Sequence, residues 1–327
     1  MKQLLKHLGA CLGAALLLLG ADAAHAQVKD FPNHPVRLIV AFPAGGGTDI
    51  VARIIAPELT KVWGQQVVID NRAGAAGVIG TEMAAAAPAD GYTLFIGTLG
   101  NLSVNQHLYK MSINPQTAFA PITQVVDVFF VLEAYPGLPL KNVQDLIAMA
   151  KAEPGKVTFS SSGAGGAPHL AGELFNRMAG VKMVHVPYKG SAPSFQDLMG
   201  GQVSVTFDSL VQSLPFIRDN RLRPLAVLGR NRSPQLPEVP TVSESGLPGY
   251  ELTNWFGMVM PAAVPKDLQA KISGDIIKVL ANPELRAKIA GMSAAVVGNT
   301  PEQFGVTMAA DSAKWAKVIK ETGMKAD

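Results

Sequence analysis

Short apolar runs alternate with amphipathic stretches along most of the chain, and glycine-rich turns separate them. The run Val36 to Phe42 is almost continuously apolar, which predicts a strand covered on both faces. A glycine turn follows at residues 45–47, Thr48 and Asp49 are good helix N-caps, and an apolar stripe of helical period begins at Ile50. This order of strand, bare turn and helix start predicts a small anion site made of backbone N–H groups.

This first turn lacks the residues of two common nucleotide-binding loops. No Lys-Ser or Lys-Thr pair follows the glycines, so the turn is not a phosphate loop of the Walker type, and Ile50 stands where a dinucleotide fingerprint needs its third glycine. A purely structural turn stays open. Asp49 would repel a bare phosphate, and its expected partner is Arg53, four residues further along the same helix face.

The same succession of elements recurs in the second half of the chain. A strand is predicted at residues 156–160, a bare turn at 161–166, a helix that starts near Pro168, and strands at 183–187 and 203–207. Alternating strands and helices of this kind predict the α/β class, with two α/β domains whose strand ends face one central cleft.

The domain boundaries follow from two stretches that would connect these units. The run 122–133 is apolar and β-branched and is expected to cross into the second domain. After a proline-rich loop at 233–248, the later elements are expected to return to the first domain. The predicted domains are therefore 27–126 together with 251–327, and 127–250, joined by a hinge with two crossings.

Residues 1–26 have the features of a cleavable secretory signal. Lys2 and Lys6 are basic, residues 8–20 are apolar, and Ala24-His25-Ala26 is a small-residue cleavage site, which predicts export to the periplasm after cleavage behind Ala26. Removal of this segment takes away the one cysteine, Cys11, and with it any disulfide, thiol nucleophile or cysteine metal site. The net charge of +3 comes with no basic tract, so nucleic acid is not an expected partner, and no cofactor is predicted. A monomer is expected.

Seven stretches of the chain carry a resemblance to a known family: Ala41–Asp49, Asn71–Gly74, Pro88–Leu94, His169–Glu173, Val184–Gly190, Phe207–Ser209 and Leu236–Thr241. In these stretches, and in their order, the chain resembles the exported solute receptors of tripartite tricarboxylate transporters, often called the Bug family. The resemblance implies a type II periplasmic-binding fold. It also implies a small carboxylate held between two domains and delivered to the subunits of a membrane permease.

The residues expected to touch the ligand occupy turns and strand ends: Phe42, Ala44, Gly45, Gly46, Thr98, Asn101, Ser160, Ser161, Gly163, His169 and Asp208. The turn before His169 departs from the family pattern, because residues 164 and 166–168 carry no polar side chain. Backbone N–H groups and Ser160–Ser162 are therefore expected to bind the ligand on that side.

Several of these residues have a second interpretation. His169 either contacts a carboxylate or is packed and hydrogen-bonded, whereas His185, inside a strand, is expected to be structural. Asp208 either binds an ammonium or hydroxyl group of the ligand or caps the segment that follows. Trp255 and Phe256 either line the pocket or belong to the core.

An enzymatic function is not expected, because the sequence contains no nucleophile elbow, zinc-binding helix motif or clustered acid pair. A hydrolase that uses Ser160, His169 and Asp208 remains an alternative, although nothing in their spacing requires it. An exported ligand sensor is a second alternative that shares the fold. The sequence does not fix which carboxylate is bound.

Overall fold

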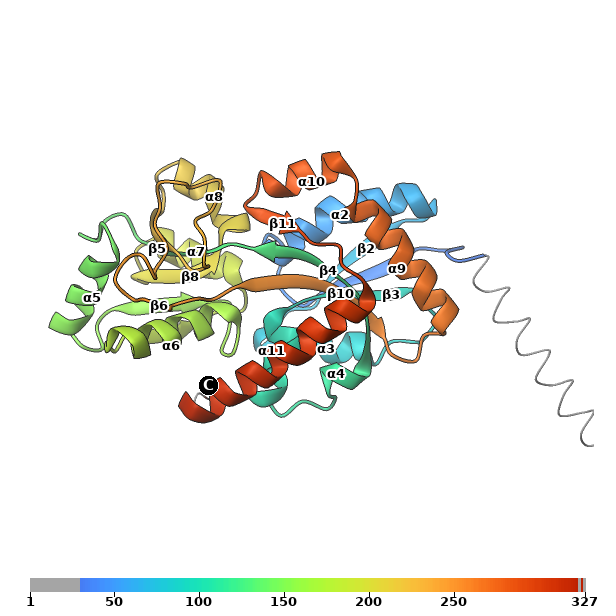
Figure 1. Ribbon diagram of the computed structural model, residues 1–327, viewed down its shortest axis with the longest axis horizontal. Coiled ribbons are helices and arrows are strands. Elements are labelled where there is room, and N and C mark those ends of the chain that lie inside the picture. The colour runs from blue at the N-terminus through green and yellow to red at the C-terminus, as the bar shows by residue number, and fades with distance from the viewer. Residues whose placement is uncertain (1–29, 323–324, 326–327) are drawn as a thin grey trace, which may run out of the picture.

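The computed structural model describes residues 30–322 and residue 325, and the predicted leader with its cleavage site lies outside the described residues. Two α/β units lie side by side, each built around its own sheet (Figure 1). The elements of the first unit are β1 (Val36–Val40), α2 (Gly47–Trp63), β2 (Val67–Asn71), α3 (Val78–Ala85), β3 (Thr93–Thr98), α4 (Pro115–Ala118), β4 (Phe119–Val128), β10 (Asn254–Pro261), α9 (Lys266–Leu280), α10 (Pro283–Ala290), β11 (Ala294–Val296) and α11 (Pro301–Thr322).

The second unit lies between β4 and β10 in the chain. Its elements are β5 (Phe130–Ala134), α5 (Val143–Ala152), β6 (Thr158–Ser161), α6 (Ala167–Ala179), β7 (Val184–Pro187), α7 (Ser191–Met199), β8 (Val205–Ser209), α8 (Leu210–Arg218) and β9 (Arg223–Val227). The predicted α/β class with two units and two crossings is confirmed. Helices α8 and α10 and strand β11 were not predicted, because each is short and lacks a long apolar period.

The sheet of the first unit has the strand order β11-β4-β10-β3-β1-β2. Strand β1 is parallel to both β2 and β3, so the carboxyl ends of all three meet at one edge, where α2 and α3 begin. Helices α2, α9 and α10 lie on one side of this sheet and α3, α4 and α11 on the other (Figure 1). Covered on both faces, β1 is apolar except at Arg37, which pairs with Asp70, as the almost continuously apolar run in the sequence predicts.

The sheet of the second unit has the order β7-β6-β8-β5-β9, and β6 is parallel to β7 and β8. One face carries Phe159 and Phe207 and packs on α6, where Phe175 contacts the ring of Phe207. The opposite face carries Ser160, Thr206 and Asp208 beneath α7 and α8. The face beneath α7 and α8 therefore carries buried polar side chains among apolar ones such as Val131.

Two strands of the first sheet continue directly into the second unit. Strand β4 is followed after Phe129 by β5, and the loop after β9 leads back into β10, whose residues pair with β4 along most of its length. Both crossings thus lie side by side in the middle of the molecule (Figure 1). The exact boundaries, 126/127 and 250/251, stay predictions.

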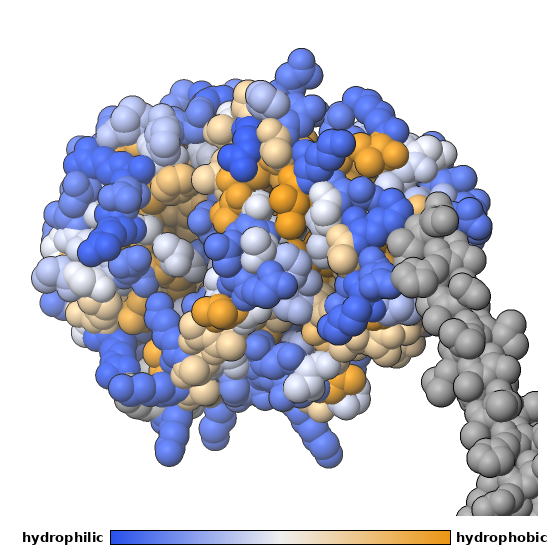
Figure 2. Space-filling view, turned by 45° about the vertical axis from the view of Figure 1, so that its right-hand side comes forward, coloured by the Kyte–Doolittle hydropathy of each residue, from blue (hydrophilic) through white to orange (hydrophobic). Residues whose placement is uncertain are grey.

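The surface is mostly polar. On the face shown in Figure 2, hydrophobic residues form small separate patches among hydrophilic ones. Among the described residues, the exposed large hydrophobic side chains are Val62, Val68, Ile79, Val184 and Val306, which lie scattered along the chain. Within residues 30–322, no helix combines the length and the apolar character that crossing a membrane requires.

Candidate ligand-binding cleft

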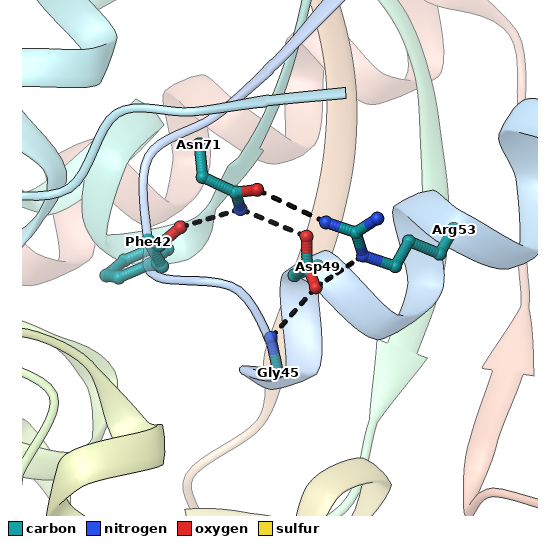
Figure 3. Close-up of polar contacts among 5 residues, drawn as sticks. All are labelled: Phe42, Gly45, Asp49, Arg53 and Asn71. Atoms are coloured by element: carbon teal, nitrogen blue, oxygen red, sulfur yellow. Dashed lines mark hydrogen bonds and ion pairs between the residues drawn. The ribbon is translucent and has the colours of Figure 1, made fainter. Parts of the chain in front are cut away.

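Asp49 holds the first turn in place, and Figure 3 shows its contacts. Its Oδ2 accepts hydrogen bonds from the Gly45 N–H at 2.9 Å and from Arg53 Nε at 2.8 Å, while Oδ1 accepts from Asn71 Nδ2 at 3.0 Å. Asn71 also donates to the carbonyl oxygen of Phe42 at 2.9 Å. The predicted ion pair between Asp49 and Arg53 is confirmed.

Burial and hydrogen bonding act on the Asp49 carboxyl in opposite directions. The side chain is 2% exposed, and this burial by itself raises its pKa. The hydrogen bonds from Arg53, Gly45 and Asn71 outweigh burial, so the pKa lies below its ordinary value of 3.8. The carboxylate is therefore ionised at neutral pH and fixes the turn.

Helix α2 begins with its backbone N–H groups unoccupied by any side-chain cap. The prediction that Thr48 or Asp49 is the N-cap is wrong: the N-cap is Gly46, with φ −77° and ψ 161°. The structure starts the helix earlier because Asp49 reaches back to Gly45 from the first turn. The first intrahelical bond runs from the Ile50 N–H to Gly46 O, so the N–H groups of residues 47–49 have no acceptor inside the helix.

The second unit repeats this turn with different side chains. Gly165 has φ +78° and Gly45 has φ +83°, and the N-cap of α6 is Gly166, with φ −69° and ψ 159°. The Gly165 N–H donates to Nδ1 of His169 at 2.9 Å, just as Gly45 donates to Asp49. The polar residue four positions after the glycine therefore closes both turns.

His169 is packed as well as hydrogen-bonded. Its ring stacks on His185 with 4.0 Å between centroids, and His185 stacks in turn on Phe159 at 5.0 Å. Nε2 of His185 lies 2.6 Å from Ser161 Oγ. The side chains of Ser161, His169 and His185 are therefore in contact with one another next to the turn. The interpretation of His169 as a packed, hydrogen-bonded histidine fits this arrangement.

Both uncapped helix starts face one cavity between the units, here called the central cavity. Its volume in this structure is about 30 Å³, and it is lined by Gly46, Gly47 and Thr48 from the start of α2 and by Gly166, Ala167 and Pro168 from the start of α6. Ser209, the N-cap of α8, also lines it. Ser191, the first residue of α7, lines it too, so N-terminal residues of four helices from the two units border the same space.

A second space, here called the side cavity, adjoins the central one. It shares Phe42 and Ser162 with the central cavity and continues along residues 74–77 and 187–189. The units touch here: the Tyr109 hydroxyl donates to Ala164 O, and a Cβ atom on Gly190 would lie 2.4 Å from Pro43 Cδ. The two units thus meet through main-chain and glycine contacts beside the cavities.

Four of the predicted ligand residues line the central cavity: Phe42, Gly46, Thr98 and Asp208. Gly163 lines the side cavity. Gly47 and Thr48, from the turn predicted to form an anion site, also line the central cavity, whereas the lining residues Ser191 and Asn254 were not singled out from the sequence. Of the two aromatic residues considered, Phe256 lines the cavity, while Trp255 packs on Phe304 and donates to Asp311.

The other predicted residues do not line either cavity, and several of them bond to residues that do or to the turns beside them. Asn101 Oδ1 accepts from both the N–H and the hydroxyl of Thr98, and its Nδ2 donates to Ala76 O at 3.1 Å. The Gly45 N–H donates to Asp49, and Ser161 forms a hydrogen bond with His185. The predicted residues that line neither cavity are Ala44, Gly45, Asn101, Ser160, Ser161 and His169. Direct contact of these residues with a ligand stays a prediction.

The repeated turn left a trace in the sequence that hydrophobic periodicity does not reveal. Residues 44–46 and 164–166 are both Ala-Gly-Gly, and an acceptor side chain follows three residues after the second glycine, at Asp49 and at His169. Asn254 gave no such trace, because it stands at the start of β10, whose other residues are buried and mostly apolar.

Ser160, His169 and Asp208 are not arranged as a catalytic relay in the contacts described. Ser160 is fully buried, accepts a hydrogen bond from Ser194 at 2.7 Å, and lies on the sheet face opposite Phe159. His169 lies on the Phe159 face, across the sheet. Within the described part of the chain, no group of three or more His, Cys, Asp or Glu side chains could hold a metal ion.

Asp208 ends β8 at the wall of the central cavity. Its Oδ1 accepts from the Ser209 N–H at 2.7 Å, and Ser209, not Asp208, caps α8 by accepting from the Val211 N–H. Burial raises the pKa of Asp208 to about 6, although the nearby Ser191 hydroxyl and the Ser209 N–H act in the other direction. Glu133, on the same sheet face, is fully buried, and burial raises its pKa well above the ordinary value.

A cavity between two α/β units, walled by helix N-termini and short polar side chains, defines a solute-binding receptor of the periplasmic-binding class. Residues 51–324 match the model of the tripartite tricarboxylate transporter family receptor, and the chain belongs to this family. Its members are receptors and not enzymes, and they work in the periplasm with a transporter.

Three similar proteins support this assignment. BugT of Bordetella pertussis is 36% identical over 309 residues, 93% of this chain and 94% of that protein. The structure of Rhodopseudomonas palustris Rpa4515 with adipate is 38% identical, covers 90% of this chain and 99% of that one, and has a TM-score of 0.88. The structure of MatC from the same organism with bound malate is 28% identical. The match covers 88% of this chain and 100% of that one, with a TM-score of 0.84.

Proposed function

We propose that the protein captures a small carboxylate in the central cavity by drawing its two units together, and delivers it to the permease subunits of a tripartite tricarboxylate transporter. The observation that carries the proposal is the convergence of the uncapped starts of α2 and α6, one from each unit, on this cavity. Backbone N–H groups at a helix start bind anions well. The adipate and malate in two similar structures support a carboxylate as that anion.

Closure follows from where the donors lie. Since the two sets of N–H groups belong to different units, a ligand contacts both sets only when the units are together. Ligand can shift the balance between open and closed forms only by its greater affinity for the closed form. The two adjacent crossings at β4–β5 and before β10 are the proposed hinge.

The test is a thermal-shift screen of the mature protein against mono-, di- and tricarboxylates, followed by small-angle scattering. A ligand at one hundred times its dissociation constant adds about 2.7 kcal/mol to the free energy of unfolding. We expect at least one carboxylate to stabilise the protein and to reduce its radius of gyration. Stabilisation by no carboxylate, or binding without any change in radius, would contradict carboxylate capture or closure respectively.

The mature protein is proposed to begin at Gln27 and to be a monomer. N-terminal sequencing of protein recovered from the periplasm tests the cleavage site. Light scattering tests the monomer. A start at Met1, or a mass of twice the chain, would contradict these two proposals.

A further inference from the structure

The first unit contacts the turn that precedes α6 in the second unit. Tyr109 of the first unit is half-buried, and its hydroxyl donates a hydrogen bond to the carbonyl oxygen of Ala164. Ala164 is followed by Gly165, whose N–H donates to His169, and by Gly166, the N-cap of α6. The Tyr109 hydroxyl therefore joins the two units right beside the start of α6.

Glycines let the two units come this close. A Cβ atom on Gly163, which has φ +133°, would lie 3.1 Å from both Cα and Cβ of Ala76. A Cβ atom on Gly165 would lie 2.7 Å from Leu108 Cδ1 and 3.2 Å from Tyr109 Cε2. The turn therefore lies against three residues of the first unit, Ala76, Leu108 and Tyr109, here called the turn socket.

Bonds within the first unit hold the turn socket. Ala75 and Ala76 have φ +45° and +49°, a left-handed conformation that costs a residue with a side chain free energy. The Ala76 carbonyl oxygen accepts hydrogen bonds from Asn101 Nδ2 at 3.1 Å and from Asn105 Nδ2 at 3.0 Å, and both of these side chains are fully buried. All of these residues belong to the first unit, so these bonds do not depend on contact with the second unit.

We propose that Tyr109 is a positioning residue for ligand capture, whose hydrogen bond to Ala164 holds the start of α6 against the first unit once the units have come together. The inference rests on the proposed function, because it assumes that closure retains the bound carboxylate. It adds a bond between the units in which no ligand takes part. Since this bond forms only in the closed form, its loss should speed the escape of a ligand and leave the encounter with the open form unchanged.

Tyr109→Phe tests the proposal, because it removes the hydroxyl and keeps the ring beside Gly165. Stopped-flow kinetics of the mature protein with succinate, glutarate and citrate measure the association and dissociation rates. For the acid that binds most tightly, we expect the dissociation rate to rise about fivefold, as for the loss of one uncharged hydrogen bond, and the association rate to stay within about twofold. An unchanged dissociation rate, or a slower association at unchanged dissociation, would overturn the proposal.

Tyr92→Phe is the matched control. The Tyr92 hydroxyl donates to Asn33 Oδ1 at 3.0 Å, and both residues belong to the first unit, so its loss should change neither rate. Equal acceleration of dissociation by both variants would show a general loosening of the protein and would overturn the positioning role of Tyr109.

A second measurement needs no ligand. The one cysteine of the chain is Cys11 in the predicted leader, so spin labels can be attached to the mature protein at Val68→Cys in β2 and Val184→Cys in β7, two exposed positions on different units. Pulsed electron resonance should show a larger share of long distances in Tyr109→Phe than in the parent or in Tyr92→Phe. The same distances in all three would overturn the proposal. Longer distances in Tyr109→Phe with no binding of the three acids would uphold the bond between the units, while carboxylate capture would fail.

Discussion

The turns at residues 44–49 and 164–169 have similar backbones at their glycines and differ in the side chain that closes them. Both place a glycine at positive φ, a second glycine at the N-cap, and an acceptor that bonds back to the first glycine. In the first turn the acceptor is an ionised Asp49 braced by Arg53 and Asn71. In the second it is His169, held by ring stacking.

This contrast indicates that the glycines determine the backbone geometry of the turn, and that the charge of the neighbouring side chains determines which residue type can close it. Four residues after Asp49 the same helix face carries Arg53, whereas four residues after His169 it carries Glu173. A carboxylate suits the first place and would meet like charge at the second. An uncharged acceptor at His169 closes the turn without that repulsion.

Filling the bare N-cap should have the largest effect. Gly46 has φ −77°, and a Cβ atom there would approach only Pro43 O at 3.4 Å, so Gly46→Val should fold, yet its side chain would cover the N–H groups of α2. We expect more than a hundredfold loss of carboxylate affinity, about 2.7 kcal/mol, by calorimetry. Gly274→Val, at an open and exposed position in α9, is the matched control and should bind normally. Unchanged affinity in a folded Gly46→Val variant would return the turn to a structural role.

Asp208 should destabilise the empty protein when ionised, in contrast to Asp49. Its pKa in the folded state is about 6, above the ordinary 3.8, so the folded state holds the proton more tightly and stability falls as pH rises through this window. Asp208→Asn should therefore raise the free energy of unfolding at pH 7.5 by up to about 3 kcal/mol, and the gain should shrink toward pH 4. Urea titrations at both pH values measure this. A variant that is less stable than the parent at pH 7.5 would contradict it.

Asp49→Asn should show the opposite sign. The lowered pKa of Asp49 means that its ionised form stabilises the fold above the ordinary value of 3.8, and that this contribution is lost as pH falls below it. We expect a loss of about 2 kcal/mol at pH 7, because charged hydrogen bonds to Arg53 and Gly45 weaken. The difference from the parent protein should narrow from pH 5 downward in melting curves. A loss that does not depend on pH would show that charge is not the reason.

The smallest expected effect tests the choice of closing side chain directly. His169→Asp should destabilise the protein, because it removes the stack on His185 and sets a carboxylate near Glu173. The double variant His169→Asp/Glu173→Arg should recover about 0.5 kcal/mol, since an acid and a base four residues apart attract. The single variant Glu173→Arg completes the double-mutant cycle. A coupling energy of zero would mean that residue 173 does not influence the closing side chain.

Periodicity and turn residues were sufficient to predict the two α/β units. The apolar run of β1 and the Asp49 to Arg53 spacing are local, and local patterns carry over into the structure. What the sequence could not supply was the face of the sheet on which each polar side chain lies. Ser160 and Ser161 look alike in the chain, yet one bonds with Ser194 on α7 and the other with His185 on β7, because neighbours on a strand face opposite sides. Asn254 reaches the cavity only through pairing of distant strands.

The wall of the central cavity has a consequence for how such receptors diversify. Much of that wall is formed by residues at helix starts, where every residue except proline keeps a backbone N–H group, while the side chains that add chemistry are few and short, among them Ser162, Ser191, Asp208 and Asn254. Capture of an anion and choice among anions are thus separate properties of the same site. A duplicated gene could acquire a new substrate through one or two exchanges at these positions without rebuilding its means of holding a carboxylate.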